Sequence, residues 1–248
     1  MSDMRFNSSR TSTFAGARST TMDQGLRQYM LGVYNYMTLS LGITGLTALG
    51  TNMMTVVTDE TGMHLTAAGH ALYGSPLMWV VALAPLGVLF AMRSVSSVST
   101  LRTLFMVFSV LMGISLSTVL LRYTGQSVTR VFFITAASFA GLSLFGYTTS
   151  KSLSSMGSFL VMGVWGLLIA MVVNMFMASS ALQFAISIVG VAIFAGLTAW
   201  DTQSIKQMYY AGDDYGTTQI KSIHGAVSLY LDFLNLFQFL LSLMGDRR

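Results

Sequence analysis

Two aspartates lie where the chain is otherwise apolar. Of all the side chains in the sequence, these two are the best candidates for proton chemistry. Asp201 follows a stretch from Ser152 to Trp200 without a charged side chain, and Asp232 lies inside the apolar segment VSLYLDFLNLFQFLLSL. Burying a carboxylate in an apolar medium is unfavourable, so such a residue usually faces a bundle interior or a water path. Two carboxyl groups within hydrogen-bond reach cannot both ionise cheaply and tend to share one proton. The two aspartates therefore predict a proton-sensitive switch.

Other polar residues could complete this switch. Arg93 ends an apolar segment on the same predicted face, where it would either bind the ionised acids or anchor its helix at the membrane interface. Asn235, one turn beyond Asp232, and Asn174 are intramembrane amides that either bond neighbouring helices or line a pathway. Interhelical bonding is the default interpretation, and Asn235 is the better placed to face the acids.

The sequence gives little support for a metal site or an enzyme active site. Calcium takes about six to eight oxygen ligands, which two aspartates cannot supply, so Asp201 and Asp232 would hold calcium only weakly and transiently. His64 and His70 lie in the longest polar connection without a third ligand placed near them, which is typical of solvated loop residues. We find no Ser–His–Asp arrangement, HExxH helix or phosphate loop. We therefore expect neither enzyme activity nor a cofactor.

Composition places these residues in a membrane protein. The chain has 248 residues, of which 53% are hydrophobic and 9% charged, with a mean hydropathy of +0.65. A soluble domain carries about 25% charged residues, and so few charges could not cover a water-facing surface. The net charge of +4 is spread over loops and helix ends, which indicates membrane orientation rather than a nucleic-acid partner. The absence of cysteine excludes disulfides and thiolate metal sites.

Seven apolar segments are long enough to cross a bilayer, since a helix needs about 20 residues to do so. They lie near residues 29–50, 72–92, 102–121, 131–149, 156–177, 181–205 and 225–244. The sequence thus predicts an all-α polytopic membrane protein, in which residues 1–25 form a flexible tail before one transmembrane domain, 26–248. Pro85 predicts a kink or an unwound turn, and the first external loop could contain a short interfacial helix.

The spans also place the acids relative to the membrane faces. Asp201 lies near the end of the sixth span and Asp232 about seven residues into the seventh, so both should be roughly 5 to 12 Å below one face. Lysine and arginine are more numerous on the side of the N-terminus, which favours a cytoplasmic N-terminus and an external C-terminus. Arg247 and Arg248 count against this, and six spans with a re-entrant last segment would put both ends inside.

Four segments carry a family resemblance. FAGLTAWDTQSIKQM and SLYLDFLNLFQFLLSLMG resemble the signature helices of the transmembrane Bax inhibitor motif family, and MGISLSTVLLRYTG and FFITAASFAGLSLFGYTTSKSLSSMGSFLVMG resemble its middle helices. The resemblance implies seven helices around a central final helix, and a pH-sensitive calcium leak gated near a di-aspartyl pair. Asp201 and Asp232 match that pair. Arg93, in an F-x-M-R stretch, resembles less closely the arginine that latches to the pair in some bacterial members.

The resemblance leads to three functional predictions. The first is a pH-sensitive calcium leak channel, with calcium as the permeant ion, protons as the signal and the lipid bilayer as its surroundings. A proton-coupled cation exchanger is the alternative, because a protonatable pair at a helix junction also suits alternating access. The third is an interaction protein that regulates a membrane protease or a stress or death response. The expected location is the bacterial inner membrane, with an organellar membrane as the alternative.

Overall fold

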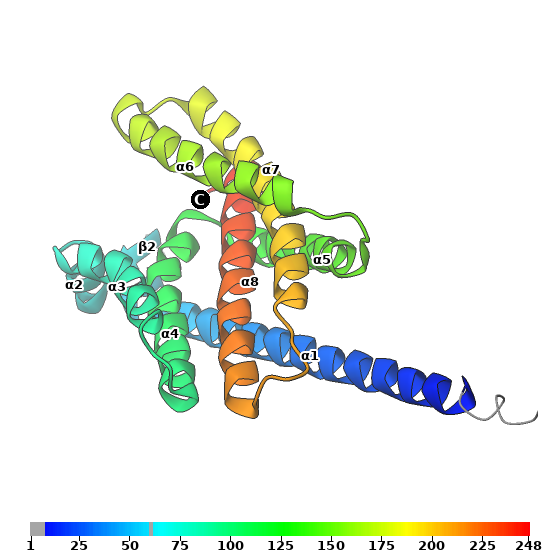
Figure 1. Ribbon diagram of the computed structural model, residues 1–248. Helices are drawn as coiled ribbons and strands as arrows, with labels where there is room; N and C mark the ends of the chain where they lie inside the picture. The colour runs from blue at the N-terminus through cyan, green and yellow to red at the C-terminus, as the bar shows by residue number, and fades with distance from the viewer. Residues whose placement is uncertain (1–7, 60–61) are drawn as a thin grey trace, which may run out of the picture.

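The computed structural model describes residues 8–59 and 62–248, with side chains from residue 24 onward. Helices form nearly all of it (Figure 1). The elements are α1 (Ser8–Thr55), β1 (Val56–Asp59), β2 (Gly62–Leu65), α2 (Ala67–Tyr73), α3 (Leu77–Met92), α4 (Val98–Arg122), α5 (Gly125–Thr148), α6 (Ser154–Met177), α7 (Ser180–Gln207) and α8 (Tyr215–Met244). The predicted all-α class is confirmed.

Five helices, α4 to α8, are long and apolar enough to cross a membrane. A sixth span results if α2 and α3, which meet at an angle of 61°, count as one bent span. The predicted number of seven is not confirmed, because α1 does not reach the same criterion within the described residues. Tyrosine, asparagine, serine and threonine residues interrupt the apolar residues of its predicted span, 29–50.

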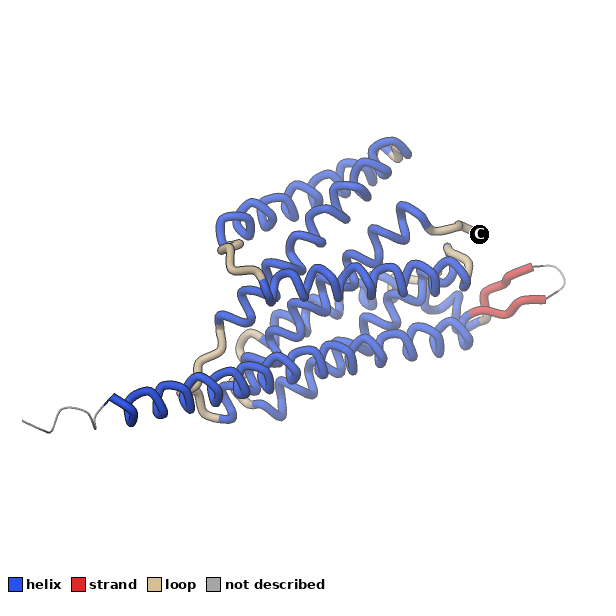
Figure 2. The backbone as a smooth tube through the Cα atoms, turned by 90° about the vertical axis from the view of Figure 1, so that its right-hand side faces the viewer, coloured by secondary structure: helices blue, strands red, loops and turns tan. Residues whose placement is uncertain are grey.

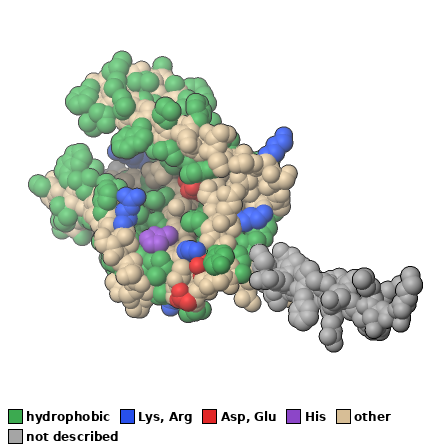
Figure 3. Space-filling view, in the orientation of Figure 1, with side chains coloured by type: hydrophobic (Ala, Val, Ile, Leu, Met, Phe, Trp, Pro, Cys, Tyr) green, Lys and Arg blue, Asp and Glu red, His purple; other side chains and the backbone are tan. Residues whose placement is uncertain are grey.

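The outer surface of the bundle is apolar. Large side chains such as Phe176, Trp79 and Leu46 are 80%, 65% and 74% exposed. Figure 3 shows hydrophobic side chains over α6 and the start of α7, with charged side chains gathered lower on the same face. A surface of this kind is stable in lipid and not in water. The protein is therefore integral to a membrane.

The connection between α1 and α3 holds two differences from the predicted pattern. β1 and β2 form an antiparallel hairpin that was not predicted, and the short helix expected in this loop is α2. The chain bends between α2 and α3, where Pro76 precedes the first residue of α3, whereas α3 stays helical through Pro85. Pro76 has no N–H to continue the preceding helix, while a proline inside a membrane helix is tolerated when its neighbours satisfy the freed carbonyl.

α8 is the central helix of the bundle (Figure 1). It packs against α1, α4, α5 and α7, and it is the most buried of the candidate spans. Bulky side chains on several sides of α8, among them Leu229, Tyr230 and Phe233, fill the spaces between these neighbours. α6 packs mainly against α7 and lies at the edge of the bundle.

Contacts along α4 show that α1, α4 and α8 run in the same direction. Arg102 at the start of α4 donates a hydrogen bond to Tyr36 Oη on α1 at 2.7 Å. At the other end of α4, the backbone N–H of Arg248 donates to Arg122 O at 3.0 Å. The C-terminus therefore lies at the end of the bundle opposite to the first half of α1 (Figure 2).

α1 begins earlier than the sequence pattern indicated. Residues 8–25, predicted to be a flexible tail, are its first turns, and the remainder of the predicted tail, 1–7, lies outside the described residues. This end of α1 projects past the other helices in Figures 1 and 2. No proline interrupts the segment, so the helix can continue beyond the apolar stretch that defined the predicted span.

Candidate functional site

Close packing of α7 against α8 positions the two acids. The helices are antiparallel neighbours, with Ile205 beside Gly225 toward their connector and Gly190 beside the Phe239 ring farther along. A Cβ at Gly190 would lie 2.5 Å from the Phe239 ring, closer than any side chain tolerates. Glycine at this position lets the helices approach where lipid offers no hydrophobic drive for association. The resulting register places the two acids between these two contacts.

Asp201 and Asp232 lie within hydrogen-bond reach of each other. Asp232 is only 4% exposed, and Asp201 is half-buried. Asp232 Oδ2 is buried without a hydrogen-bond partner, and no cation pairs with either acid in the part of the chain that the structure describes. Two ionised carboxylates in this position would repel each other in a poorly polarisable medium, and one shared proton removes that repulsion.

The acid pair lies deeper along α8 than predicted. α8 begins at Tyr215 rather than near residue 225, so Asp232 is roughly 26 Å from the start of its helix at about 1.5 Å per residue. Asp201 is only roughly 9 Å from the end of α7. The connector makes up the difference by running beside the first turns of α8, where Lys221 Nζ donates to Met208 O at 3.1 Å.

The structure does not bring Arg93 to the acids. Arg93 follows α3 with an exposed side chain, although the preceding Met92 is buried. α3 packs chiefly against α4, whereas the acids lie between α7 and α8. No ion pair joins Arg93 to Asp201 or Asp232 among the described side chains. The predicted latch is therefore not formed in this conformation.

The two candidate amides are also occupied elsewhere. Asn174 holds the turn between α6 and α7, since its Nδ2 donates to Gln183 Oε1 at 3.1 Å and its Oδ1 accepts from Ser179 N at 3.0 Å. This turn is roughly 30 Å from the acids along α7. Asn235 Nδ2 donates to Leu231 O of its own helix at 2.8 Å. The structure thus places Asn174 away from the acids and leaves Asn235 one turn from Asp232.

The sequence pattern missed a buried polar contact that joins three helices. Tyr230 Oη on α8 lies 2.7 Å from Thr44 Oγ1 on α1, and Thr44 Oγ1 also lies 2.9 Å from Ser109 O on α4. Tyr230 is fully buried, with its ring edge-on to Phe105 and Phe108. A tyrosine in an apolar helix needs a partner for its hydroxyl group, which was the available signal. The contact fixes α8 against α1 and α4.

Lys206 also has a role that spacing did not reveal. Lys206 Nζ donates to Tyr147 O at 2.8 Å and lies 4.9 Å from the centre of the Tyr147 ring. It therefore ties the end of α7 to the end of α5.

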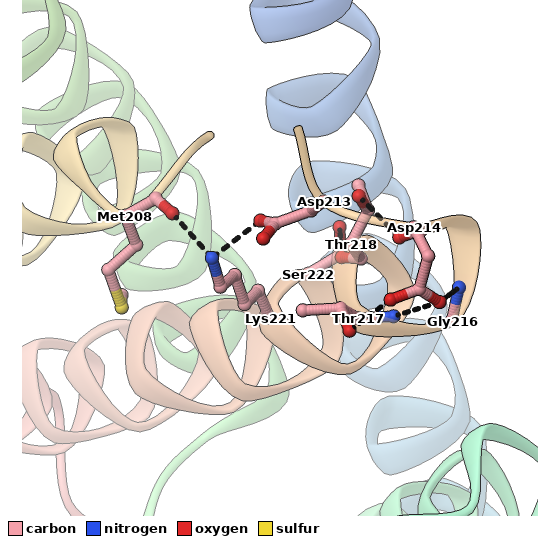
Figure 4. Close-up of polar contacts among 8 residues, drawn as sticks. All are labelled: Met208, Asp213, Asp214, Gly216, Thr217, Thr218, Lys221 and Ser222. Atoms are coloured by element: carbon pink, nitrogen blue, oxygen red, sulfur yellow. Dashed lines mark hydrogen bonds and ion pairs between the residues drawn. The ribbon is translucent and has the colours of Figure 1, made fainter. Parts of the chain in front are cut away.

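Two acids in the connector, Asp213 and Asp214, have polar partners (Figure 4). Asp213 pairs with Lys221 Nζ at 2.5 Å. Asp214 caps α8, where Oδ2 accepts from the backbone N–H groups of Gly216 and Thr217 at 2.8 and 3.2 Å. Hydrogen bonds from the Thr217 side chain and backbone hold the pKa of Asp214 below its usual value. These contacts fix the start of α8.

Metal-ligand chemistry at the acid pair is limited to its two carboxyl groups. Within the described ranges, no three or more His, Cys, Asp or Glu residues are grouped so that they could hold a metal ion. His64 and His70 lie on β2 and α2, and His64 Nε2 is 3.4 Å from Asp59 Oδ1 on the paired strand. Two carboxylates leave most of the about six to eight ligand positions of calcium to water. A calcium ion at the pair would therefore stay largely hydrated.

Comparison with known proteins places the whole bundle in one sequence family. The family described as inhibitor of apoptosis-promoting Bax1 matches residues 26–248. A protein of Caulobacter vibrioides is 47% identical over 233 residues, which cover 92% of each chain. A protein of Rickettsia prowazekii is 44% identical, covering 94% of this chain and 95% of its own. The inner membrane protein YbhL of Escherichia coli (strain K12) is 39% identical, covering 90% of this chain and 94% of its own.

Proposed function

The chain belongs to the family described as inhibitor of apoptosis-promoting Bax1, and on this premise we propose that it is a pH-sensitive calcium leak channel gated by Asp201 and Asp232. The observation that carries the proposal is the contact between two carboxyl groups at the buried α7–α8 interface, without a cationic partner among the described residues. The Escherichia coli relative YbhL is named an inner membrane protein, which supports a location in the bacterial inner membrane.

The gate works through repulsion between the two carboxylates. With one shared proton, the pair holds α7 against α8 by a hydrogen bond. Loss of that proton leaves two negative charges, which repel by roughly 4 kcal/mol at about 4 Å and an effective dielectric constant of about 20. An energy of this size shifts an equilibrium between two helix arrangements about a thousandfold. Separated carboxylates then admit water and a hydrated cation.

Calcium suits this gate as a passing ion and not as a resident one. The two carboxylates attract a divalent cation, and water supplies its remaining ligands. Weak binding of this kind is what conduction requires, because an ion must leave the site as readily as it enters. Asn235, one turn from Asp232, would line this path. Arg93 would act as a latch only in a second conformation, in which the end of α3 moves toward α7 and α8.

The proposed topology has seven spans with a cytoplasmic N-terminus. The shared direction of α1, α4 and α8, with α3 between the first two and α5 to α7 between the last two, supports it, as does the excess of lysine and arginine on the N-terminal side. The chain contains no cysteine, so single cysteines can report sidedness directly. Ser152→Cys, between α5 and α6, should react with an impermeant thiol reagent only from the cytoplasm, and Ser179→Cys, between α6 and α7, only from outside. Labelling of both from one side would refute this topology.

Calcium flux into vesicles tests the function. Purified protein is reconstituted around a calcium-sensitive dye, and influx is measured from about pH 5 to about pH 8. We expect a pH-dependent leak in the unmodified protein and a pH-independent one in Asp201→Asn and Asp232→Asn. Unaltered pH dependence in both variants would refute the gate.

A proton-sensitive dye in the same vesicles separates the leak from an exchanger. A leak moves calcium without an obligatory counterflow of protons, whereas an exchanger moves the two in a fixed ratio. Calcium flux that stops when proton movement is blocked would show that the protein is an exchanger and not a channel. Absence of any flux, together with a cellular effect that survives Asp232→Asn, would favour the interaction protein.

A further inference from the structure

A long apolar groove lies between α1 and α5, with α8 as its floor. Its volume is about 1040 Å³, at the upper end of the roughly 300 to 1,000 Å³ typical of small-molecule sites. Leu31 and Leu46 on α1 and Leu144 on α5 are at least half exposed along it, whereas Phe139 on α5 and Phe233 on α8 are buried. We call this feature the α1–α5 groove. It opens sideways, toward the surface that lipid covers.

The groove exists because α1 and α5 both pack on α8 without closing on each other. They meet at a hydrogen bond of 2.6 Å between Tyr34 Oη and Ser143 Oγ. Gly42 and Gly45 on the groove face of α1 contribute no side chains, and a Cβ built on either would have no atom within 4 Å. The hollow is therefore a property of the sequence at these positions.

Positive charge gathers at one end of the groove. Arg27 lines that end, and it forms no ion pair among the described side chains. Tyr147 lines the same end, where Lys206 Nζ donates to its carbonyl oxygen and lies over its ring. The described lining residues include no acid. The groove thus combines a cationic mouth with an apolar length, as a molecule with an anionic head and an apolar tail requires.

The length of the groove suits a hydrocarbon chain. From Arg27 to Leu41 the groove follows α1 for roughly 21 Å, more than half of the about 30 Å hydrocarbon core. From Arg27 to Leu49 it runs roughly 33 Å. An extended acyl chain can therefore lie along it.

We infer that the α1–α5 groove binds an anionic phospholipid, with one acyl chain along α1 and its phosphate held by Arg27. A guanidinium group binds phosphate oxygens through paired N–H donors, which sets the head group at the membrane surface. The acyl chain then fills the space over Gly42 and Gly45. This assignment depends on the membrane location and not on the calcium-leak proposal.

Photo-crosslinking tests the inferred lipid site. The full chain is reconstituted in phosphatidylcholine vesicles with a trace of phosphatidylglycerol that carries a photoreactive group in its acyl chain, and labelled peptides are mapped. We expect labels on α1 and α5 in the unmodified protein. Gly45→Leu should remove most of this labelling by filling the groove. Gly50→Leu is the matched control, because Gly50 is on the same helix, is equally open and does not line the groove.

A second variant tests the head group without altering the groove. Arg27→Gln should reduce labelling by the phosphatidylglycerol probe about fivefold, as expected for loss of one cation near a membrane surface. It should leave labelling by the matching phosphatidylcholine probe unchanged. Equal labelling of Gly45→Leu and the unmodified protein, or equal loss of both probes in Arg27→Gln, would overturn the assignment. A dimer in the unmodified protein that Gly45→Leu dissociates would show that a second copy covers the groove instead.

Discussion

The chain carries two pairs of aspartates that differ in the partners they have. Asp213 and Asp214 lie in the connector before α8, where a lysine, a threonine hydroxyl group and backbone N–H groups bind them. Asp201 and Asp232 lie between α7 and α8. Among the described residues, the structure shows no cation beside them, and the polar contact that it shows for each acid is with the other. The protein thus supplies partners to the acids near the surface and withholds them from the buried ones.

This difference separates structural acids from a candidate switch. A carboxylate with a lysine or a capping interaction is ionised at neutral pH and stabilises one arrangement of the chain. Two carboxyl groups with only each other must take up or release a proton when their surroundings change. A membrane acid therefore suggests a switch when the structure shows no counter-charge beside it.

The largest effect should follow from giving the buried pair a cation. Asp201→Lys provides Asp232 with a partner like that of Asp213, which holds Asp232 ionised and removes the shared proton. The pH dependence of calcium influx between about pH 5 and about pH 8 should then disappear. Asp213→Lys, which breaks the connector ion pair, is the control and should keep that dependence. Persistent pH dependence in Asp201→Lys would contradict the assignment of the buried aspartates, rather than the connector aspartates, as the switch.

The next effect concerns the position of α8, on which the buried pair depends. Tyr230→Phe removes the hydroxyl group that lies 2.7 Å from Thr44 Oγ1. The loss of one buried hydrogen bond should lower the free energy of unfolding by about 1 kcal/mol and Tm by about 2 to 4 °C. Thermal unfolding in detergent measures this. Tyr215→Phe is the control, because Tyr215 is 76% exposed, and an equal shift there would refute the assigned role.

A smaller effect is expected for the connector ion pair. Lys221→Gln removes the contact with Asp213. The side chain of Lys221 is 31% exposed and that of Asp213 is 15% exposed. A partly exposed pair contributes at most about 1 kcal/mol, and added salt screens it. The difference in Tm between Lys221→Gln and the unmodified protein should therefore shrink at high salt. A difference that grows with salt would show that the ion pair does not stabilise the connector.

The smallest effect is a pH-dependent one at Asp214. Its pKa is lowered in the folded chain by hydrogen bonds from Thr217. Its stabilising contribution is therefore complete above the ordinary aspartate pKa of about 3.9 and is lost as pH falls through the lower folded-state value. Asp214→Asn keeps a capping group but cannot titrate. Its Tm should fall less than that of the unmodified protein on acidification, and parallel curves would contradict the role of Asp214.

Apolar length predicted most of the helices well. The segments 156–177 and 181–205 correspond to α6 and α7 within two residues at each end, because each of these helices is apolar over most of its length. The start of α8 was missed by ten residues, since Tyr215 to His224 is polar and the Asp214 cap extends the helix into it. The hairpin of β1 and β2 was missed for a similar reason, because its short strands lie in a polar connection.

The site was predictable where it depended on helix register and not where it depended on side-chain direction. An acid in each of two antiparallel helices predicted the contact between Asp201 and Asp232. Arg93 lies at a helix end, where its long side chain can turn either way, and spacing does not determine which. Asn174 lies at the end of α6, where backbone groups without helical partners bind its amide.

Infrared difference spectroscopy of the reconstituted protein tests most directly whether the buried acids share a proton. A protonated carboxyl group has a C=O stretching band well separated from that of a carboxylate. At neutral pH we expect one such band in the unmodified protein, a shifted band in the single variants Asp201→Asn and Asp232→Asn, and none in the double variant. Absence of the band in the unmodified protein, an unshifted band in both single variants, or its survival in the double variant would contradict the shared proton and the gate built on it.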